Sequence, residues 1–260
     1  MKMTDKSFFI TNRFGEKLEA LIRQPNKKRK NPAVLFVSGL GMDLHEWNNS
    51  FDEISKLFVN KGFLTLQFSF AGCGNSEGSY VEMTFDRQAQ QIADVLSWLK
   101  KRDEIDTKRI GIMAQSCGAP STLLTDITYI KSIFFISGAF NSFANLKRKF
   151  IEKNAYNPDG VSSYPRTSGK SNLIGSSFWQ QLKQYDEVKQ AGKLMMPVFL
   201  ATGNKDTYVN PTDAKRIYET IPHKNKQLKI YPGGDHGLEK PPIARAQLLR
   251  DMDEWFTKTL

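Results

Sequence analysis

The stretch that decides the fold is Ile110-Gly111-Ile112-Met113-Ala114-Gln115-Ser116-Cys117-Gly118. Its apolar first half predicts a buried strand, and the small residues after Ser116 can open a helix. The pattern follows G-x-S-x-G, with Ala114 in place of the first glycine, and places the serine on a tight strand-to-helix turn. Such a turn lifts the Ser116 hydroxyl clear of the sheet and leaves the Cys117 N–H free to bind an oxyanion. The alternative interpretation of Ser116 is a helix N-cap on a turn rich in small residues.

Strand and helix patterns alternate along most of the chain. A β-hairpin is expected over residues 7–24. Strands are then predicted at 33–37, 63–70, 109–113, 133–136, 198–201 and 228–231, and helices at 47–60, 85–100, 116–125, 211–220 and 242–257. Alternation of this kind predicts a mostly parallel sheet with helices on both faces.

Residues 140–192 interrupt the alternation. They hold prolines, glycines, serines and eight aromatic residues. A structureless loop of that length would be unusual in a compact domain, so some helix is expected there. We expect a small cap inserted over the carboxyl edge of the sheet, within a single domain of residues 1–260.

Asp206 and His236 each follow a predicted strand. Loops at the carboxyl edge of a parallel sheet converge, so both side chains can meet Ser116 there. A serine hydroxyl needs a base before it can attack a carbonyl, and His236 would take its proton while Asp206 fixes the histidine tautomer. The rival acid, Asp213, falls in the first turn of a predicted helix, where the helix dipole favours a negative charge.

Two other histidines compete with His236. His223 lies in a charged loop and is expected at the surface, whereas His45 could line the pocket but precedes Ser116 in the chain. Asp235, the neighbour of His236, is expected to point elsewhere because adjacent side chains on an extended loop diverge.

A second oxyanion donor is expected from Ser38-Gly39-Leu40-Gly41, which follows the predicted strand 33–37. Glycines there let backbone N–H groups approach a substrate, and the Leu40 N–H is the candidate beside that of Cys117. The alternative is a plain glycine turn after a strand.

Together these features resemble the serine α/β-hydrolase superfamily. The resemblance rests on the Ser38–Gly41 loop with Trp47, the segment Phe70-Ala71-Gly72-Cys73-Gly74-Asn75-Ser76-Glu77-Gly78, the serine turn, and Asp206 and His236 in that order. It covers residues 7–138 and 194–258, and is closest to compact bacterial carboxylesterases of the cinnamoyl/feruloyl esterase and acyl-thioesterase-like group. It implies the α/β-hydrolase fold and a Ser116–His236–Asp206 triad.

Three residues depart from the usual pattern of that superfamily. Ser38 stands where histidine is usual, Ser69 where aspartate is usual, and Ala114 where glycine is usual. None of the three changes removes a catalytic group. We expect Ser38 and Ser69 to alter the rigidity of the loops that carry them.

The net charge of +10 is concentrated in two segments. Residues 1–30 carry +6, including the run 27–30, which is expected to be a solvated loop. Residues 139–193 carry +5. We find no aromatic platform or nucleic-acid-binding module, so no nucleic-acid partner is expected. The basic residues Lys147, Arg148, Lys149 and Lys153 form either a solvated helix face or a site for an anionic leaving group.

The chain has no run of 18 apolar residues and no apolar segment behind its first residues, so neither a membrane span nor a signal peptide is expected. Cys73 and Cys117 are expected as reduced thiols of a cytoplasmic protein.

The sequence therefore predicts a serine hydrolase that cleaves a small-molecule carboxylic ester or thioester through an acyl-enzyme, with no metal or organic cofactor. A peptidase on the same fold is the first alternative, although no large added domain that would select peptides is evident. The second is a non-catalytic ligand-binding protein that retains the pocket, which would not need all three triad groups.

Overall fold

The computed structural model describes residues 3–26, 30–166 and 171–260. The predicted loop at 27–30 therefore lies, apart from Lys30, outside the described residues. The strands are β1 Met3–Thr11, β2 Lys17–Pro25, β3 Asn31–Val37, β4 Leu64–Phe68, β5 Ile105–Gln115, β6 Ser132–Ile136, β7 Ser162–Pro165, β8 Ser171–Ile174, β9 Val198–Gly203 and β10 Lys226–Tyr231. The α-helices are α1 Ser50–Lys61, α2 Phe85–Lys100, α3 Gly118–Leu124, α4 Ser142–Glu152, α5 Ser176–Gln184, α6 Glu187–Ala191, α7 Pro211–Thr220 and α8 Pro242–Thr259, with 3₁₀ turns at Trp47–Asn49 and Tyr80–Glu82.

The described residues form one mixed sheet of eight strands in the order β1-β2-β4-β3-β5-β6-β9-β10. The predicted N-terminal hairpin is present, since β1 and β2 pair antiparallel, and β2 pairs antiparallel with β4. The remaining strands pair parallel, from β4 across to β10. This is the α/β-hydrolase fold that was predicted.

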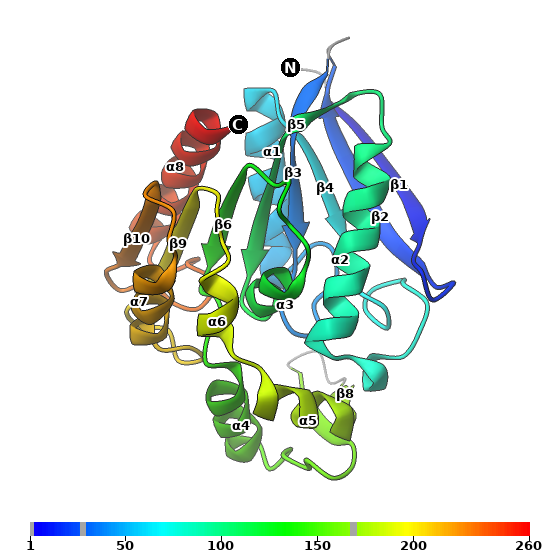
Figure 1. The fold of residues 1–260 in the computed structure, drawn as a ribbon, viewed down its shortest axis with the longest axis vertical. Coiled ribbons are helices and arrows are strands. Elements are labelled where there is room, and N and C mark those ends of the chain that lie inside the picture. Colours follow the sequence, from blue (N-terminus) through cyan, green and yellow to red (C-terminus); the bar gives the residue numbers. More distant parts are fainter. Residues whose placement is uncertain (1–2, 27–29, 167–170) are drawn as a thin grey trace.

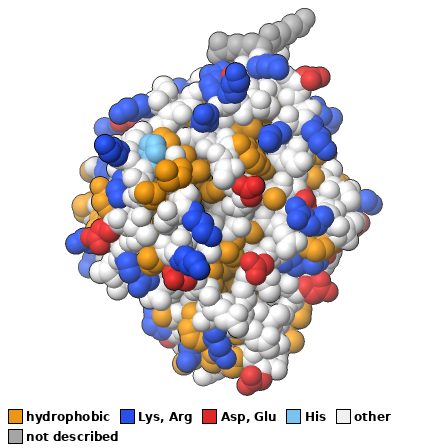
Figure 2. Space-filling view, in the orientation of Figure 1, with side chains coloured by type: hydrophobic (Ala, Val, Ile, Leu, Met, Phe, Trp, Pro, Cys, Tyr) orange, Lys and Arg blue, Asp and Glu red, His pale blue; other side chains and the backbone are white. Residues whose placement is uncertain are grey.

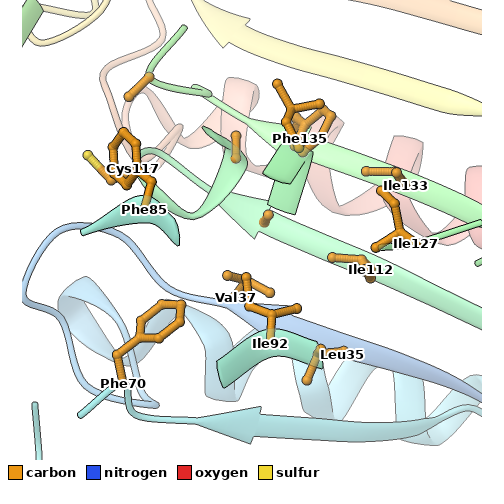
Figure 3. Close-up of a cluster of buried hydrophobic side chains, with 14 of the residues drawn as sticks. Leu35, Val37, Phe70, Phe85, Ile92, Ile112, Cys117, Ile127, Ile133 and Phe135 are labelled. Atoms are coloured by element: carbon orange, nitrogen blue, oxygen red, sulfur yellow. The ribbon is translucent and has the colours of Figure 1, made fainter. Parts of the chain in front are cut away.

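Helices cover both faces of the sheet (Figure 1). A cluster of buried apolar side chains lies between the helices and the sheet on each face. Alternate residues of β3 serve different layers: Val34 and Phe36 pack with α1 and α8, whereas Leu35 and Val37 pack on the α2 and α3 side. Figure 3 shows Leu35 and Val37 beside Ile92 of α2. Full burial of a side chain of this size stabilises the fold by roughly 1.5–3 kcal/mol, so both faces of the sheet need a helical cover.

The predicted helix over 47–60 begins later than expected. Asn48 and Asn49 have φ values of 51° and 56°, in the left-handed region, and the α-helix starts only at Ser50. Asparagine tolerates this backbone better than most residues because its short side chain can bond locally. The hydrophobic spacing predicted the buried face but could not detect the two left-handed residues before it.

The segment between β6 and β9, residues 137–197, holds α4, the β7–β8 hairpin, α5 and α6. We call it the inserted segment. It lies beyond the carboxyl ends of the parallel strands, in the lower part of Figure 1. Trp179 is its centre: its ring packs edge-on against Phe150 and Tyr156, and its indole N–H donates to Ser162 Oγ at 2.8 Å. Helix was expected here, whereas the β7–β8 hairpin was not.

Lysine and arginine side chains are spread over the face of the molecule shown in Figure 2, with no continuous basic stripe. None of the helices in the described part of the chain is both long and apolar enough to span a membrane.

Gly118 opens α3 where that helix meets the end of β3. A Cβ there would lie 2.6 Å from the Val37 carbonyl oxygen and 2.7 Å from that of Ser38. Both are backbone atoms, so Gly118→Ala should lower the free energy of unfolding by roughly 1–3 kcal/mol, measured by urea denaturation. Gly192→Ala is the control. Gly192 has helical backbone angles and no neighbour closer than 3.5 Å, so its change should stay within about 0.5 kcal/mol. Equal effects would contradict the close packing at Gly118.

Candidate active site

Ser116 sits directly after β5 with a φ of 52°, in the left-handed region. Its N–H donates to the Ile136 carbonyl at 2.9 Å, and its own carbonyl accepts from Ala139 N–H at 2.9 Å. A serine in this conformation stores backbone strain, and such strain persists only where surrounding contacts hold it. The end of β6 thus fixes Ser116 and raises its hydroxyl into the pocket.

His236 and Asp206 meet Ser116 at the same edge of the sheet. His236 Nε2 lies 3.0 Å from Ser116 Oγ, and His236 Nδ1 lies 2.7 Å from Asp206 Oδ2. The other carboxylate oxygen of Asp206 accepts the N–H groups of Tyr208 at 2.7 Å and Val209 at 3.0 Å. The Asp206 side chain is fully buried, whereas that of His236 is 21% exposed. The Asp206 carboxylate is therefore held in place and shielded from solvent, whereas His236 is partly open toward the pocket.

The rival acids are used elsewhere. Asp213 lies in the first turn of α7, as predicted, but it is buried and accepts the side-chain amides of Asn141 and Asn145 at 3.4 and 3.0 Å. It therefore ties α7 to the inserted segment. Asp235 accepts the N–H groups of Glu239 and Lys240 and so closes its own loop.

The rival histidines are also occupied. His45 Nδ1 lies 2.7 Å from Asp52 Oδ2, and the His45 side chain does not line the pocket. His223 is half-buried, not fully at the surface, because its Nδ1 accepts the N–H of Asn225 at 3.1 Å.

The expected oxyanion donors, the N–H groups of Leu40 and Cys117, belong to residues that line the same cavity as the Ser116 hydroxyl. In this structure the Cys117 thiol lies beside that hydroxyl and beside the Leu40 N–H. Burial raises the pKa of this thiol to about 12, and burial likewise raises the pKa of the Cys73 thiol to about 12. Both sulfurs are therefore protonated at neutral pH.

The two serines that depart from the superfamily pattern both bond the loop between β3 and α1. Ser69 Oγ accepts the Leu44 N–H at 2.9 Å and contacts Glu19 Oε2 at 3.2 Å. Ser38 Oγ makes a long contact of 3.5 Å with the Met42 carbonyl. Ser69 thus anchors the far end of the loop that carries Leu40.

A cavity of about 470 Å³ lies over Ser116 and His236, between the sheet edge and the inserted segment. Its walls are mainly apolar and aromatic. The side chains involved include Leu40, Met42, Trp47, Leu146, Phe150, Tyr164, Tyr208 and Val209. The Tyr208 ring lies 4.8 Å from that of His236. Such a pocket suits an apolar or aryl group better than a strongly hydrated one.

The four basic residues of α4 and its end divide into two pairs. Lys149 and Lys153 line the cavity. Lys149 also donates to Glu152 Oε2 at 2.8 Å. Lys147 and Arg148 do not line the cavity: Lys147 lies over the rings of Phe143 and Tyr156, and Arg148 bonds Glu152 and the backbone carbonyls of residues 207 and 208.

Sequence reasoning missed four charged residues of the cavity wall, namely Glu46, Arg166, Lys205 and Glu239. Arg166 donates to the Leu40 carbonyl at 3.0 Å and contacts Met42 Sδ. Glu46 is 7% exposed. The one sequence feature that pointed to Glu46 was its position next to Trp47, in the loop that follows β3. Among the described residues, no group of histidine, cysteine and acidic side chains could hold a metal ion.

Residues 49–260 match the sequence pattern of the prolyl oligopeptidase family, which spans far more than half of the chain. The chain belongs to the prolyl oligopeptidase family. Within this family of α/β-hydrolases, the matched region carries Ser116, Asp206 and His236, and the β3 loop with Leu40 lies before it.

Two proteins illustrate the sequence relatives of this family member. An uncharacterized 31.7 kDa protein from the traX-finO intergenic region of Escherichia coli is 21% identical and covers 88% of this chain and 89% of its own. Caffeoylshikimate esterase of Arabidopsis thaliana is 34% identical over 104 residues, which are 39% of this chain and 29% of the plant protein.

Among solved structures, Est1E from Butyrivibrio proteoclasticus with bound ferulic acid superposes with a TM-score of 0.78. It is 19% identical and the match covers 96% of this chain and 99% of Est1E. At this identity the likeness concerns the fold, and it extends over the inserted segment as well as the sheet.

Proposed function

We propose that this prolyl oligopeptidase family member is a serine hydrolase that cleaves a carboxylic ester or thioester through an acyl-enzyme. The observation that supports this most is the continuous contact from Ser116 Oγ through His236 to Asp206, at 3.0 and 2.7 Å. It ends on a carboxylate that is buried and already held by two backbone N–H groups. A ligand-binding protein would not need this alignment.

In the proposed first step, Ser116 Oγ attacks the carbonyl carbon and His236 Nε2 accepts its proton. The resulting imidazolium is stabilised by Asp206, whose second oxygen keeps its bonds to Tyr208 and Val209. Because Asp206 cannot rotate without losing those bonds, it holds His236 in the tautomer that leaves Nε2 free to accept.

The negative charge that develops on the substrate oxygen would be held by the N–H groups of Leu40 and Cys117. Collapse of this intermediate releases the alcohol or thiol with the proton from His236, and leaves the acyl group on Ser116. Water, activated by His236, then attacks the acyl-enzyme and restores the serine. Each step uses only these side chains and water.

The cavity walls support an apolar or aryl acyl group as substrate. Phe150, Tyr164 and Tyr208 supply aromatic surface around Ser116. The ferulic acid bound to Est1E and the name of the plant relative, caffeoylshikimate esterase, point to the same substrate class. In this proposal the inserted segment acts as a cap on a single catalytic domain.

The family description favours peptide-bond hydrolysis as a second candidate. A panel of aryl esters, thioesters and chromogenic peptides of matched acyl groups separates the two. A higher kcat/KM on peptides than on esters would contradict the esterase proposal and favour a peptidase.

The two cysteines, Cys73 and Cys117, are free and buried, which supports the proposal of a reducing, cytoplasmic location.

Ser116→Ala should leave the fold intact and lower kcat by roughly 10³-fold or more, because the triad residues act as a unit. The measurements are hydrolysis of a p-nitrophenyl ester and labelling by a fluorophosphonate probe, which should be lost together. Activity within tenfold of the parent protein would exclude Ser116 as the nucleophile.

Asp206→Asn should lower kcat on the order of 10⁴-fold, because the amide favours the wrong histidine tautomer. Asp213→Asn is the matched control, since Asp213 bonds asparagine amides and not His236. It should affect stability more than kcat. Reversed effects would mean that the wrong carboxylate is assigned.

Lys149 and Lys153 on the cavity wall support an anionic leaving group, such as that of an acyl-CoA. Salt should then lower kcat/KM for an acyl-CoA but not for a neutral ester of the same acyl group, because charges are screened beyond ~8 Å at physiological ionic strength. Replacing both lysines by glutamine should remove the difference, whereas Lys147→Gln with Arg148→Gln should preserve it. An equal salt response of both substrates would rule out this leaving group.

A further inference from the structure

Glu46 is a buried acid on the loop that carries the proposed oxyanion donor. Its Oε2 accepts the Gly39 N–H at 2.7 Å, and its Oε1 accepts the Trp47 N–H at 3.2 Å. Only 7% of the residue is exposed. One side chain therefore spans the loop, from the glycine next to Leu40 to the start of the 3₁₀ turn that precedes α1.

The backbone of Glu46 is itself strained. Its φ of 61° and ψ of −178° fall in a region that is almost confined to glycine. Such a conformation persists only when other contacts compensate for it. The two hydrogen bonds that the Glu46 carboxylate makes to Gly39 and Trp47 are among the contacts that can compensate for it.

Glu46 also lies in the electrostatic environment of the reacting groups. A Cβ on Gly39 would be 3.3 Å from Ser116 Cβ and 3.5 Å from Glu46 Oε2. Because glycine has no side chain, only the backbone of Gly39 lies between the side chains of Ser116 and Glu46. The charged groups that act on Glu46 are His236, from the loop after β10, and Arg166, from the inserted segment. The thiols of Cys73 and Cys117 face it as well, and both are protonated at neutral pH.

Burial raises the pKa of Glu46 to about 7, against the opposing effects of the Gly39 and Trp47 N–H groups and of His236 and Arg166. The side chain is therefore mostly a carboxylate at pH 8 and mostly a neutral acid at pH 6. A carboxylate offers both oxygens as acceptors, whereas the neutral acid carries a proton on one of them. Protonation thus weakens one of the two bonds that span the loop.

We propose that Glu46 is a positioning residue of the oxyanion loop, and that its carboxylate form, not its protonated form, holds Gly39 and Leu40 in the geometry that Ser116 chemistry requires. This inference rests on the proposed function, because the loop matters to the reaction only if Ser116 is the nucleophile. Glu46 does not touch substrate in this proposal. It acts through the backbone that it bonds.

Glu46→Gln tests the proposal, because the amide has one acceptor oxygen and imitates the protonated acid at every pH. The rate constant of fluorophosphonate labelling and kcat/KM for p-nitrophenyl butyrate are measured from pH 5.5 to 8.5, and each is expressed as the ratio of parent to variant. The ratio isolates the effect of position 46, because the two proteins differ only there. The ratio should rise through a midpoint near pH 7, to about tenfold at pH 8.5, the effect of one lost hydrogen bond.

Thermal stability is a second readout, and Glu46→Gln should not lower it even though the same substitution lowers the labelling rate. An acid whose pKa is raised on folding destabilises the folded state once it ionises, so the contribution of Glu46 to stability falls as the pH rises from about 4.5 to 7. Glu46→Gln removes that buried charge. Its Tm at pH 8.5 should equal or exceed that of the parent while its labelling rate is lower, which a purely structural role would not produce.

The control is Glu53→Gln, which removes a half-exposed carboxylate that pairs with Arg245 on the far side of α1. Its ratio should stay near one at every pH. A pH-independent ratio for Glu46→Gln, or one that falls as pH rises, would overturn this inference while labelling of Ser116 leaves the proposed function standing. Failure of the parent protein to be labelled at Ser116 would overturn both.

Discussion

The hydrogen bond from the Ser116 N–H to the Ile136 carbonyl is the constraint on which the site depends. It joins the end of β5 to the end of β6 and holds Ser116 in a left-handed conformation that its neighbours must stabilise. The adjacent strands complete the arrangement, because β3 supplies Leu40, β9 supplies Asp206 and β10 supplies His236 from the loops that follow them. A parallel sheet delivers four separate segments to one edge, and no single loop has to carry the chemistry.

The two sides of the site differ in how firmly they are held. On the Asp206 side, three short hydrogen bonds to a fully buried carboxylate fix the histidine. On the Leu40 side, the loop is held by a strained glutamate and by Ser69, where the superfamily pattern has aspartate. In the proposed mechanism, the acid–base half is therefore held by buried hydrogen bonds, whereas the oxyanion half would depend on a titratable side chain.

The proximity of Ser116, Asp206 and His236 was predictable from sequence because each residue follows an apolar strand, and the loops at one edge of a parallel sheet converge. Glu46 was not, because hydropathy cannot reveal that a charged loop residue turns inward through a left-handed backbone. The same applies to Asn48 and Asn49, which delay the start of α1. The β7–β8 hairpin was missed since its strands are short, rich in serine and without alternation. Asp213 was placed in the correct helix turn, but the two asparagines that bury it come from a segment 70 residues away, beyond local reasoning.

The inserted segment leaves the sheet at β6 and returns at β9, and these two strands are neighbours. Because the two strands are parallel, the segment leaves β6 at the carboxyl edge of the sheet and has to cross back to the amino edge before β9 begins. Its length and sequence can change without altering the register of any strand as long as that crossover is kept. The cavity wall that it contributes and the groups that face Ser116 from the sheet are thus carried by separable parts of the chain. Substrate range and bond-breaking chemistry can diverge independently in a protein built this way, and a transplanted segment from a relative would still have to bring the chain back across the sheet to the start of β9.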